Sequence, residues 1–364
     1  MTNIIPFFYL NMFPTFVKKK KMSQKILLGN TLQELQSIVS ELGLPSFTAK
    51  QISKWLYNKK VTDIEQMTNI SLKNRLLLSE YYLVGRTMPV EVVESVDGTK
   101  KYLFKANGGF IESVYIPEED RATLCVSSQI GCKMNCLFCM TGKQGFSGNL
   151  TAGDIMNQIL SIPETEKLTN LVFMGMGEPF DNTLPMLHSL EILTSSYGFA
   201  WSPRRITVSS IGLIPGLKVF LEKSQCHLAI SLHSPFPQER EMLMPSEKAY
   251  PIEEILELLK TYDFKHQRRV SFEYILFDGL NDTMRHAREL VRILSGIECR
   301  INLISFHPIP GVDLKGCDMK QMVKFRDYLT DNNITTTIRK SRGEDILAAC
   351  GMLSTSKMQE EENN

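Results

Sequence analysis

Residues 123–139 read TLCVSSQIGCKMNCLFC: a β-prone run, TLCVS, is followed by three cysteines in the pattern C-x3-C-x2-C. Three thiolates on one loop can ligate three irons of a [4Fe–4S] cluster and leave the fourth iron open to another ligand. Phe138 precedes the last cysteine and is expected to shield such a cluster from water. The pattern makes Cys132, Cys136 and Cys139 the candidate cluster ligands.

Two further roles for these cysteines stay open. A structural zinc site needs four ligands, and Cys125, seven residues before Cys132, could be the fourth. Zinc sites usually pair one C-x2-C with a second, however, and the sequence has no second pair. The cysteines could also be core residues that are close in sequence by coincidence. We favour the cluster, and eight cysteines in 364 residues are too few for a disulfide framework.

From about residue 123 onward, strand-like and helix-like runs alternate. The strand-like runs are TLCVS (123–127), NLVFM (170–174), RITVS (205–209), HLAISL (227–232), RVSFEYIL (269–276) and INLISF (301–306). Helical patterns such as AGDIMNQIL, LPMLHSLEIL, IEEILELLK and MRHARELVRIL lie between them, and a late run, ITTTIRK (334–340), follows. Six βα units predict a parallel sheet or partial barrel. In such folds, chemistry collects at the carboxyl ends of the strands.

Two regions precede this series. Residues 22–90 predict a small helical module, because NTLQELQSIVSELGLP, FTAKQISKWLYNKK and SLKNRLLLSEYY have helical character. Residues 90–128 contain β-prone runs around two turn signals, Asp97-Gly98 and Asn107-Gly108-Gly109. The predicted organisation is an extension (1–21), the helical module (22–90), a core with a β extension (91–353) and a polar tail (354–364).

The composition is that of a soluble globular protein, with 43% hydrophobic and 22% charged residues. It excludes collagen, a disordered tail and a small disulfide-stapled scaffold. The net charge of +1 does not by itself indicate a nucleic-acid partner. The sequence contains no apolar run of about 18 residues, the length that would predict a membrane-spanning helix. Residues 1–21 are apolar first and basic afterwards, the reverse of a signal peptide, so Met22 is the expected start and the cytoplasm the expected location.

Three segments carry a resemblance to a known family: CVSSQIGCKMNCLFCMTGKQGFSGNLTAGDI, MGMGEPFDN and SRGEDILAACGML. The cysteine loop after the first strand of a βα series resembles the radical S-adenosylmethionine (SAM) superfamily. Within it, residues from about 30 to 353 resemble the dual-specificity 23S ribosomal RNA/tRNA adenine-C2 methyltransferases. The resemblance implies an α/β fold: a partial (βα)6 radical-SAM barrel with an N-terminal helical module and a β-hairpin extension.

The resemblance also implies two cofactors, one [4Fe–4S] cluster per chain and SAM. Gly177 and Glu178 match the family segment that holds the amino end of SAM. The further SAM contacts that it implies are Ser209, Ser231, Leu232, His233 and His307. At position 307 the common family form has asparagine, so this contact would be made with different chemistry.

Three more residues match the family's catalytic positions: Cys350, Cys125 and Glu112. The resemblance implies that one SAM methylates Cys350 and that a second SAM is reductively cleaved to a radical that takes hydrogen from this methyl group. The resulting carbon radical adds to C2 of adenine. Glu112 would accept the C2 proton, and Cys125 would release the product by forming a disulfide with Cys350. This route suits C2, an electron-poor carbon that cannot attack a SAM methyl group directly.

The implied substrates are adenine 2503 of 23S ribosomal RNA and adenine 37 of tRNAs. The implied protein partner is an electron donor such as flavodoxin or ferredoxin. The chain is expected to be a monomer and to have no membrane partner. Local basic clusters could track phosphates: Lys59-Lys60, Lys100-Lys101, Arg204-Arg205, Arg268-Arg269 and Arg339-Lys340 with Arg342. Two other functions stay open, a C8-specific 23S ribosomal RNA methyltransferase conferring antibiotic resistance and a zinc-stabilised RNA-binding module.

Overall fold

A ten-stranded sheet organises the computed structural model, which describes residues 24–264 and 270–355. Its order is β14-β13-β12-β11-β10-β9-β6-β5-β4-β3. The strands are β3 (Glu91–Glu94), β4 (Lys100–Ala106), β5 (Gly109–Pro117), β6 (Ala122–Cys125), β9 (Asn170–Phe173), β10 (Ile206–Ser210), β11 (His227–Ser231), β12 (Val270–Leu276), β13 (Cys299–Ser305) and β14 (Thr335–Ile338). From β6 to β14 all neighbours pair in parallel. This confirms the predicted partial barrel, and β14 extends its six strands.

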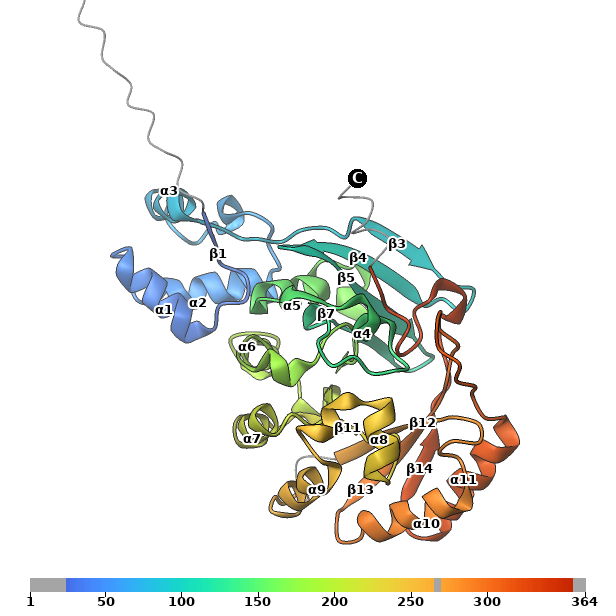
Figure 1. The fold of residues 1–364 in the computed structure, drawn as a ribbon. Helices are drawn as coiled ribbons and strands as arrows, with labels where there is room; N and C mark the ends of the chain where they lie inside the picture. The colour runs from blue at the N-terminus through green and yellow to red at the C-terminus, as the bar shows by residue number, and fades with distance from the viewer. Residues whose placement is uncertain (1–23, 265–269, 356–364) are drawn as a thin grey trace, which may run out of the picture.

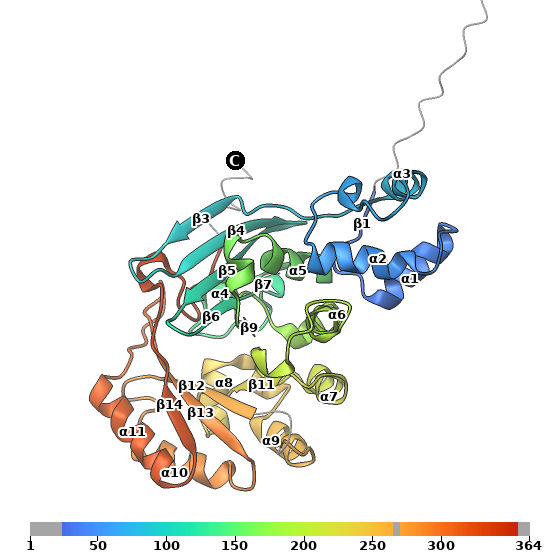
Figure 2. The same cartoon turned by 180° about the vertical axis from the view of Figure 1, so that it is seen from behind.

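Helices between the strands cover the outer face of the barrel (Figures 1 and 2). They are α5 (Ala152–Leu160), α6 (Thr183–Thr194), α7 (Ile214–Lys223), α9 (Ile252–Lys260), α10 (Met284–Ile293) and α11 (Met319–Asp331). Helix α8 (Pro237–Leu243) lies instead at the carboxyl end of β11, where its Leu243 carbonyl accepts the N–H of Leu137 at 2.9 Å. Helix α9 shows why the covering helices pack this way, because it buries Ile252, Ile255 and Leu256 and turns its acidic residues outward. Strand β12 is buried along its whole length, as expected for a parallel strand with both faces covered.

The region predicted as a β-hairpin extension forms three antiparallel strands, β3, β4 and β5. Strand β5 also pairs with β6, so the extension continues the barrel sheet. The two predicted turns join β3 to β4 and β4 to β5. A short hairpin of β7 (Gln129–Gly131) and β8 (Phe146–Asn149) was not predicted from the sequence, and it flanks the cysteine loop.

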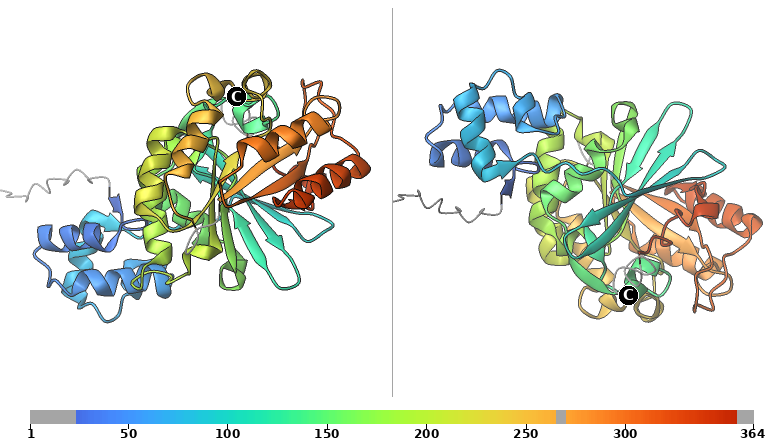
Figure 3. Two further views of the ribbon diagram at one scale, coloured as in Figure 1. Left: turned by 90° about the horizontal axis from the view of Figure 1, so that it is seen from below. Right: turned by 90° about the horizontal axis from the view of Figure 1, so that it is seen from above.

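The N-terminal helices lie beside the barrel helices, at the opposite side from β13 and β14 (Figure 3). They are α1 (Leu32–Glu41), α2 (Thr48–Ser53) with a π-helical continuation (Lys54–Asn58), and α3 (Leu72–Tyr81), joined by a short parallel pair, β1 (Lys25–Ile26) and β2 (Tyr82–Leu83). Arg86 donates to the Leu160 carbonyl at 2.5 Å, and the Asn58 side chain donates to that of Gly198 at 2.6 Å. One hydrophobic core includes residues of both regions.

Residues 1–21, predicted to be an extension, lie outside the described residues, as do 356–364 of the predicted tail. Across residues 24–264 and 270–355, none of the helices has the length and apolar character needed to cross a membrane.

Candidate active site

The three cysteines lie on the cluster loop, residues 132–139, between β7 and helix α4 (Met140–Gln144). The backbone N–H of Cys132 donates to the carbonyl of Gly145 at 2.8 Å and closes the base of the loop. Gly131 has a φ of 74°, and a Cβ at this position would lie 1.8 Å from the Gly145 carbonyl oxygen. Only glycine permits this close approach, so the backbone itself sets the shape of the loop.

The thiols of the cluster loop lie near one another in buried surroundings. Cys136 is close enough to both Cys132 and Cys139 for their charges to interact. Burial raises the pKa of all three thiols, to about 12 for Cys132. They therefore hold their protons until a metal replaces them. The Phe138 ring lies edge-on to the His233 ring, with 4.7 Å between ring centroids. Its expected role in shielding a cluster from water stays a prediction.

The arrangement distinguishes a cluster from a zinc ion. Within the parts of the chain that the structure describes, no three His, Cys, Asp or Glu side chains converge as one metal ion would require. A [4Fe–4S] cluster does not need such convergence, because each thiolate binds its own iron. Cys125, the candidate fourth zinc ligand, interacts instead with Cys350 and Arg339. The loop therefore fits a [4Fe–4S] cluster better than a zinc ion.

Gly177 and Glu178 follow β9 at its carboxyl end. Gly177 has a φ of 99°, and a Cβ there would lie 2.5 Å from the Cβ of Gln129, so this turn also requires glycine. The buried Glu178 carboxylate accepts the N–H of Phe180 and of Ile211, each at 3.0 Å. Burial raises its pKa to about 7. The carboxylate interacts with the cluster loop and thus stands where the loop meets the strand ends.

The predicted residues Ser209, Ser231 and Leu232 lie at the carboxyl ends of β10 and β11. A residue that the sequence analysis missed, Arg240 of α8, ties these ends together. Its fully buried guanidinium donates to the carbonyls of Ile211 and Ser231, each at 3.0 Å, and to that of Leu232 at 3.2 Å. A carboxylate, that of Glu247, balances its charge. The only sequence signal was two opposite charges seven residues apart.

His233, predicted as a cofactor contact, is buried beneath the cluster loop. Its backbone φ is 54°, an uncommon left-handed value. Nδ1 accepts the N–H of Ile275 at 3.0 Å, and burial lowers the pKa of the ring to about 3. The ring is therefore neutral, with its proton on Nε2. It supports Phe138, and the predicted cofactor contact stays a prediction for Nε2.

His307, the other predicted histidine, faces the C-terminal segment, residues 341–355. Its Nε2 lies 2.8 Å from Oγ of Ser341, and its Nδ1 lies 3.5 Å from a carboxylate oxygen of Glu344. Nε2 is therefore engaged by the segment that carries Cys350, and Nδ1 lies near a carboxylate of the same segment. Its predicted contact with SAM also stays a prediction.

The C-terminal segment brings Cys350 to the cluster loop. The N–H of Met140 donates to the carbonyl of Gly351 at 2.7 Å, directly after the last cysteine of the loop. Cys350 is close enough to Cys139, Cys125 and Arg339 for their charges to interact. The structure therefore brings the two predicted catalytic cysteines together, although they are distant in sequence.

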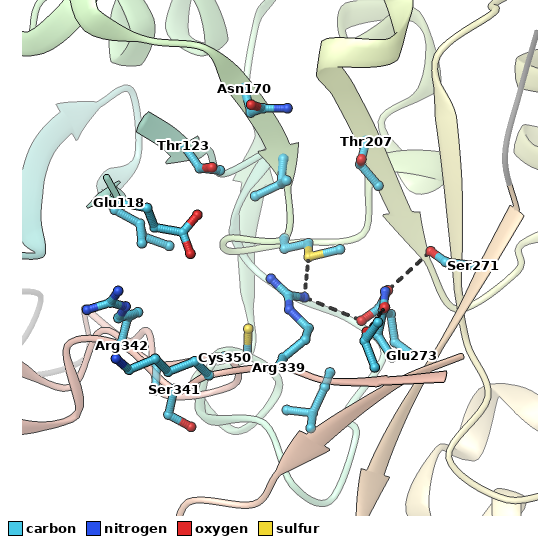
Figure 4. Close-up of a pocket in the computed structure, with 18 of the residues that line it drawn as sticks. Glu118, Thr123, Asn170, Thr207, Ser271, Glu273, Arg339, Ser341, Arg342 and Cys350 are labelled. Atoms are coloured by element: carbon cyan, nitrogen blue, oxygen red, sulfur yellow. Dashed lines mark hydrogen bonds and ion pairs between the residues drawn. The ribbon is translucent and has the colours of Figure 1, made fainter. Parts of the chain in front are cut away.

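Cys350 is exposed on a cavity of about 660 Å³ inside the barrel (Figure 4). Cys125 differs from it, because it is buried in β6 and burial raises its pKa to about 12. One of the two cysteines is thus open to a large substrate and the other is enclosed behind it.

Glu112 lies on β5 and is buried. Its carboxylate pairs with Lys101 at 2.9 Å and accepts the N–H of Ser354 at 3.0 Å. Burial raises its pKa, whereas Lys101 opposes this change. Glu112 therefore contacts the C-terminal segment four residues beyond Cys350.

The turn between β3 and β4 holds the same segment from the other side. Asp345 accepts the hydroxyl of Ser95 at 2.6 Å and the N–H of Val96 at 3.2 Å. Asp97 accepts the N–H of Gly343 at 3.2 Å. Sequence analysis missed this clamp because its partners are about 250 residues apart.

Replacing Asp345 with alanine is expected to loosen the segment. Two partly or fully solvent-exposed hydrogen bonds that hold the segment disappear, so amide exchange within residues 343–351 should accelerate roughly severalfold. Hydrogen–deuterium exchange with mass spectrometry measures this. Asp331→Ala, at an exposed site at the end of α11, is the control. Equal exchange in the two variants would show that the clamp does not hold the segment.

The predicted basic clusters divide into two groups. Lys60, Lys100 and Lys101 pair with carboxylates on the protein. The cavity receives Arg204, Arg339, Lys340 and Arg342 of the predicted clusters and, in addition, Arg121 and Arg300. Of these, Arg121, Arg339 and Arg342 also pair with carboxylates. Arg268-Arg269 lies outside the described residues.

Comparisons with known proteins agree with this architecture. The radical SAM superfamily matches residues 126–291, and the ribosomal RNA large subunit methyltransferase N-terminal domain matches residues 26–84. A Phocaeicola vulgatus protein described as a "Probable dual-specificity RNA methyltransferase RlmN" is 65% identical over 336 residues, covering 92% of this chain and 96% of that protein. The "Dual-specificity RNA methyltransferase RlmN" of Desulfotalea psychrophila is 42% identical over 346 residues, covering 91% and 96%.

One crystal structure is similar over most of its length. It is described as a radical SAM methyltransferase from Sphaerobacter thermophilus, and it superposes with a TM-score of 0.84 at 38% identity. The match covers 90% of this chain and 98% of that one.

Proposed function

The chain belongs to the RlmN family of radical SAM dual-specificity RNA methyltransferases, and from this premise we propose that it methylates adenine C2 by way of a methyl group carried on Cys350. The observation that carries the proposal is the position of Cys350. Its thiol is exposed on the barrel cavity, next to both the cluster loop and Cys125. A methyl group on this sulfur would face the substrate side and the cofactor side of the site together.

The family uses a [4Fe–4S] cluster and SAM. When bound, they supply the methyl group and the radical chemistry that activates it. We propose that Cys132, Cys136 and Cys139 hold the cluster. The amino end of SAM is assigned to Gly177 and Glu178, whose carboxylate lies beside the cluster loop. The further proposed SAM contacts are Ser209, Ser231, Leu232, His233 and His307.

The remaining roles belong to side chains near Cys350. The Cys350 thiolate accepts the methyl group as a nucleophile. Glu112 is the proposed acceptor of the C2 proton, and the rise in its pKa through burial makes it a better base. Its bond to Ser354 keeps it attached to the segment that carries the methyl group. Cys125 is the thiol that releases the product.

RNA is the substrate class that the family indicates. We propose adenine 2503 of 23S ribosomal RNA and adenine 37 of tRNAs as the targets. Residues 22–90 are proposed to dock RNA and residues 91–353 to carry the catalytic core. A flavodoxin or ferredoxin is the proposed electron donor, for a monomer working in the cytoplasm.

A product analysis tests the function. Anaerobically reconstituted enzyme would be incubated with deuteromethyl-SAM, a reductant and 23S RNA, and the modified nucleoside would be compared with 2-methyl- and 8-methyladenosine standards by mass spectrometry. We expect 2-methyladenosine whose methyl group carries two deuteriums and one hydrogen. An 8-methyl product would assign the C8 reaction instead. No product, together with no cluster absorbance, would favour the zinc-stabilised RNA-binding module.

A further inference from the structure

Apolar side chains line part of the barrel cavity, close to Cys350. They come from two separate parts of the sheet, β5 and β9 on one side and β13 and β14 on the other, and are Ile116, Val172, Met174, Ile304 and Ile338. A base that an enzyme takes out of a nucleic-acid stack is commonly held between such side chains and read by hydrogen bonds at its edge. The cavity volume, about 660 Å³, is within the range of small-ligand sites. The cavity can therefore accept a single nucleotide.

Arg339 is a cation of this cavity that lies near both candidate catalytic cysteines. It follows β14, and its Nη1 donates to Sδ of Met174 and to a carboxylate oxygen of Glu273, both at 3.3 Å. Its guanidinium interacts with both Cys350 and Cys125. A third of its side chain is exposed to the cavity, and Figure 4 shows its second terminal nitrogen directed into the open space.

A polar network fixes the direction of this guanidinium. Glu273, buried in β12, accepts the side-chain amide of Asn302 at 2.7 Å and the hydroxyl of Ser271 at 3.2 Å. The Asn302 amide oxygen in turn accepts the hydroxyl of Thr337 at 2.8 Å. Neighbouring strands thus hold Glu273, and Glu273 holds one edge of Arg339. The other edge remains available as a donor, because a guanidinium carries five N–H groups in a fixed plane.

The chemistry of adenine supplies the acceptor. C2 lies between two ring nitrogens, N1 and N3, and both accept hydrogen bonds. Carbon addition at C2 moves electron density onto these nitrogens. A preorganised cationic donor at one of them would orient C2 towards Cys350 and stabilise that density.

We propose that Arg339, held by Glu273, donates a hydrogen bond to a ring nitrogen adjacent to C2 of the target adenine. The inference rests on the proposed function and adds a residue that selects the base and its orientation. Arg339 neither gains nor loses a covalent bond or a proton in this role. Guanine is disfavoured at the same position, because its N1 carries a hydrogen and its C2 carries an amino group.

The test combines changes in the protein with changes in the base. RNA hairpins would carry adenosine, 1-deazaadenosine or 3-deazaadenosine at the target position, so that one ring nitrogen at a time is replaced by C–H. Dissociation constants would be measured with the holoenzyme in the absence of reductant, and single-turnover rates after reductant is added. For wild type, the affinity and the single-turnover rate should fall on the order of 10- to 100-fold with one of the two deaza RNAs, since the lost hydrogen bond involves a charged donor.

Arg339→Met should bind and methylate the adenosine RNA less well than wild type by a similar factor. Replacing adenosine by that deazaadenosine should cause no further loss in this variant. Because this change leaves Glu273 buried without its cation, Arg339→Met/Glu273→Gln is measured in parallel. Arg342→Met is the matched control. This change removes another cation of the cavity, one that pairs with Asp97. It should weaken binding of all three RNAs by the same factor, so that the difference in affinity between the adenosine RNA and the deaza RNA remains.

Two outcomes would overturn the inference. One is a wild type that treats all three RNAs alike, and the other is a deaza effect that is as large in both Arg339 variants as in wild type. Either result could occur while wild type still forms 2-methyladenosine. Absence of that product from wild type would instead reject the proposed function.

Discussion

Cys350→Ala is expected to abolish methyl transfer to RNA and to leave the fold and the cluster site intact. The thiol is the proposed methyl carrier, and alanine removes only an exposed sulfur from the cavity wall. The segment keeps its other attachments, including the bond from Met140 to the Gly351 carbonyl and that from Thr141 to the Leu353 carbonyl. The loss should therefore be chemical rather than structural, with no labelled methyl group detected on either protein or RNA.

Radiolabelled SAM measures both transfers, because the protein and the RNA can be counted separately. Cys317→Ala is the control, since Cys317 is a partly buried cysteine that does not line the cavity. It should retain labelling of the RNA. RNA methylation by Cys350→Ala would show that the methyl group reaches adenine without passing through this sulfur.

Local patterns predicted much of the fold. The run HLAISL became β11, and IEEILELLK became α9, with bounds within one residue of those expected. Such periodicities are properties of short segments, so they can be read without knowing the tertiary structure. The short strands β7 and β8 were missed because they have only three and four residues and contain glycine. Their pairing depends on the cysteine loop between them.

The same difference holds for the site: features within one short segment could be predicted, whereas contacts between distant residues could not. The candidate cluster loop could be identified because its three proposed ligands lie within eight consecutive residues. Arg339 was identified only as one of a basic cluster, and its partner Glu273 is 66 residues away. The one available signal was a carboxylate in the middle of the otherwise apolar run VSFEYIL, which indicates a polar side chain inside the barrel.

Burial also changed the interpretation of individual residues. His233 was predicted as a SAM contact from the family resemblance, and that contact stays a prediction; in the structure its ring packs against Phe138. Its Nδ1 is already occupied by the N–H of Ile275. A single sequence does not reveal which atom of a side chain faces a cofactor, since this depends on packing by residues distant in the chain.

Cys125→Ala is expected to trap a covalent protein–RNA adduct. Release of the product requires the Cys125 thiol to give up its proton and attack the Cys350 sulfur, so that a disulfide forms as the bond between sulfur and the methylene carbon breaks. The electron pair of that bond goes to the carbon, which takes up a proton and becomes the methyl group. Cys125 is the candidate for this attack because it lies near enough to Cys350 for their charges to interact. Alanine at position 125 removes the attacking thiol and leaves the carbon–sulfur link intact.

Burial of Cys125 also fits the proposal that Cys350 alone carries the methyl group. It raises the pKa of Cys125 to about 12, so near neutral pH this residue stays a thiol and does not compete with Cys350 for the methyl group of SAM. A denaturing gel should show a nuclease-sensitive shift in the variant, and mass spectrometry should find an adenosine on the Cys350 peptide. Cys226→Ala, at another buried cysteine, should turn over without accumulating this species. Full turnover by Cys125→Ala would mean that a different group resolves the adduct.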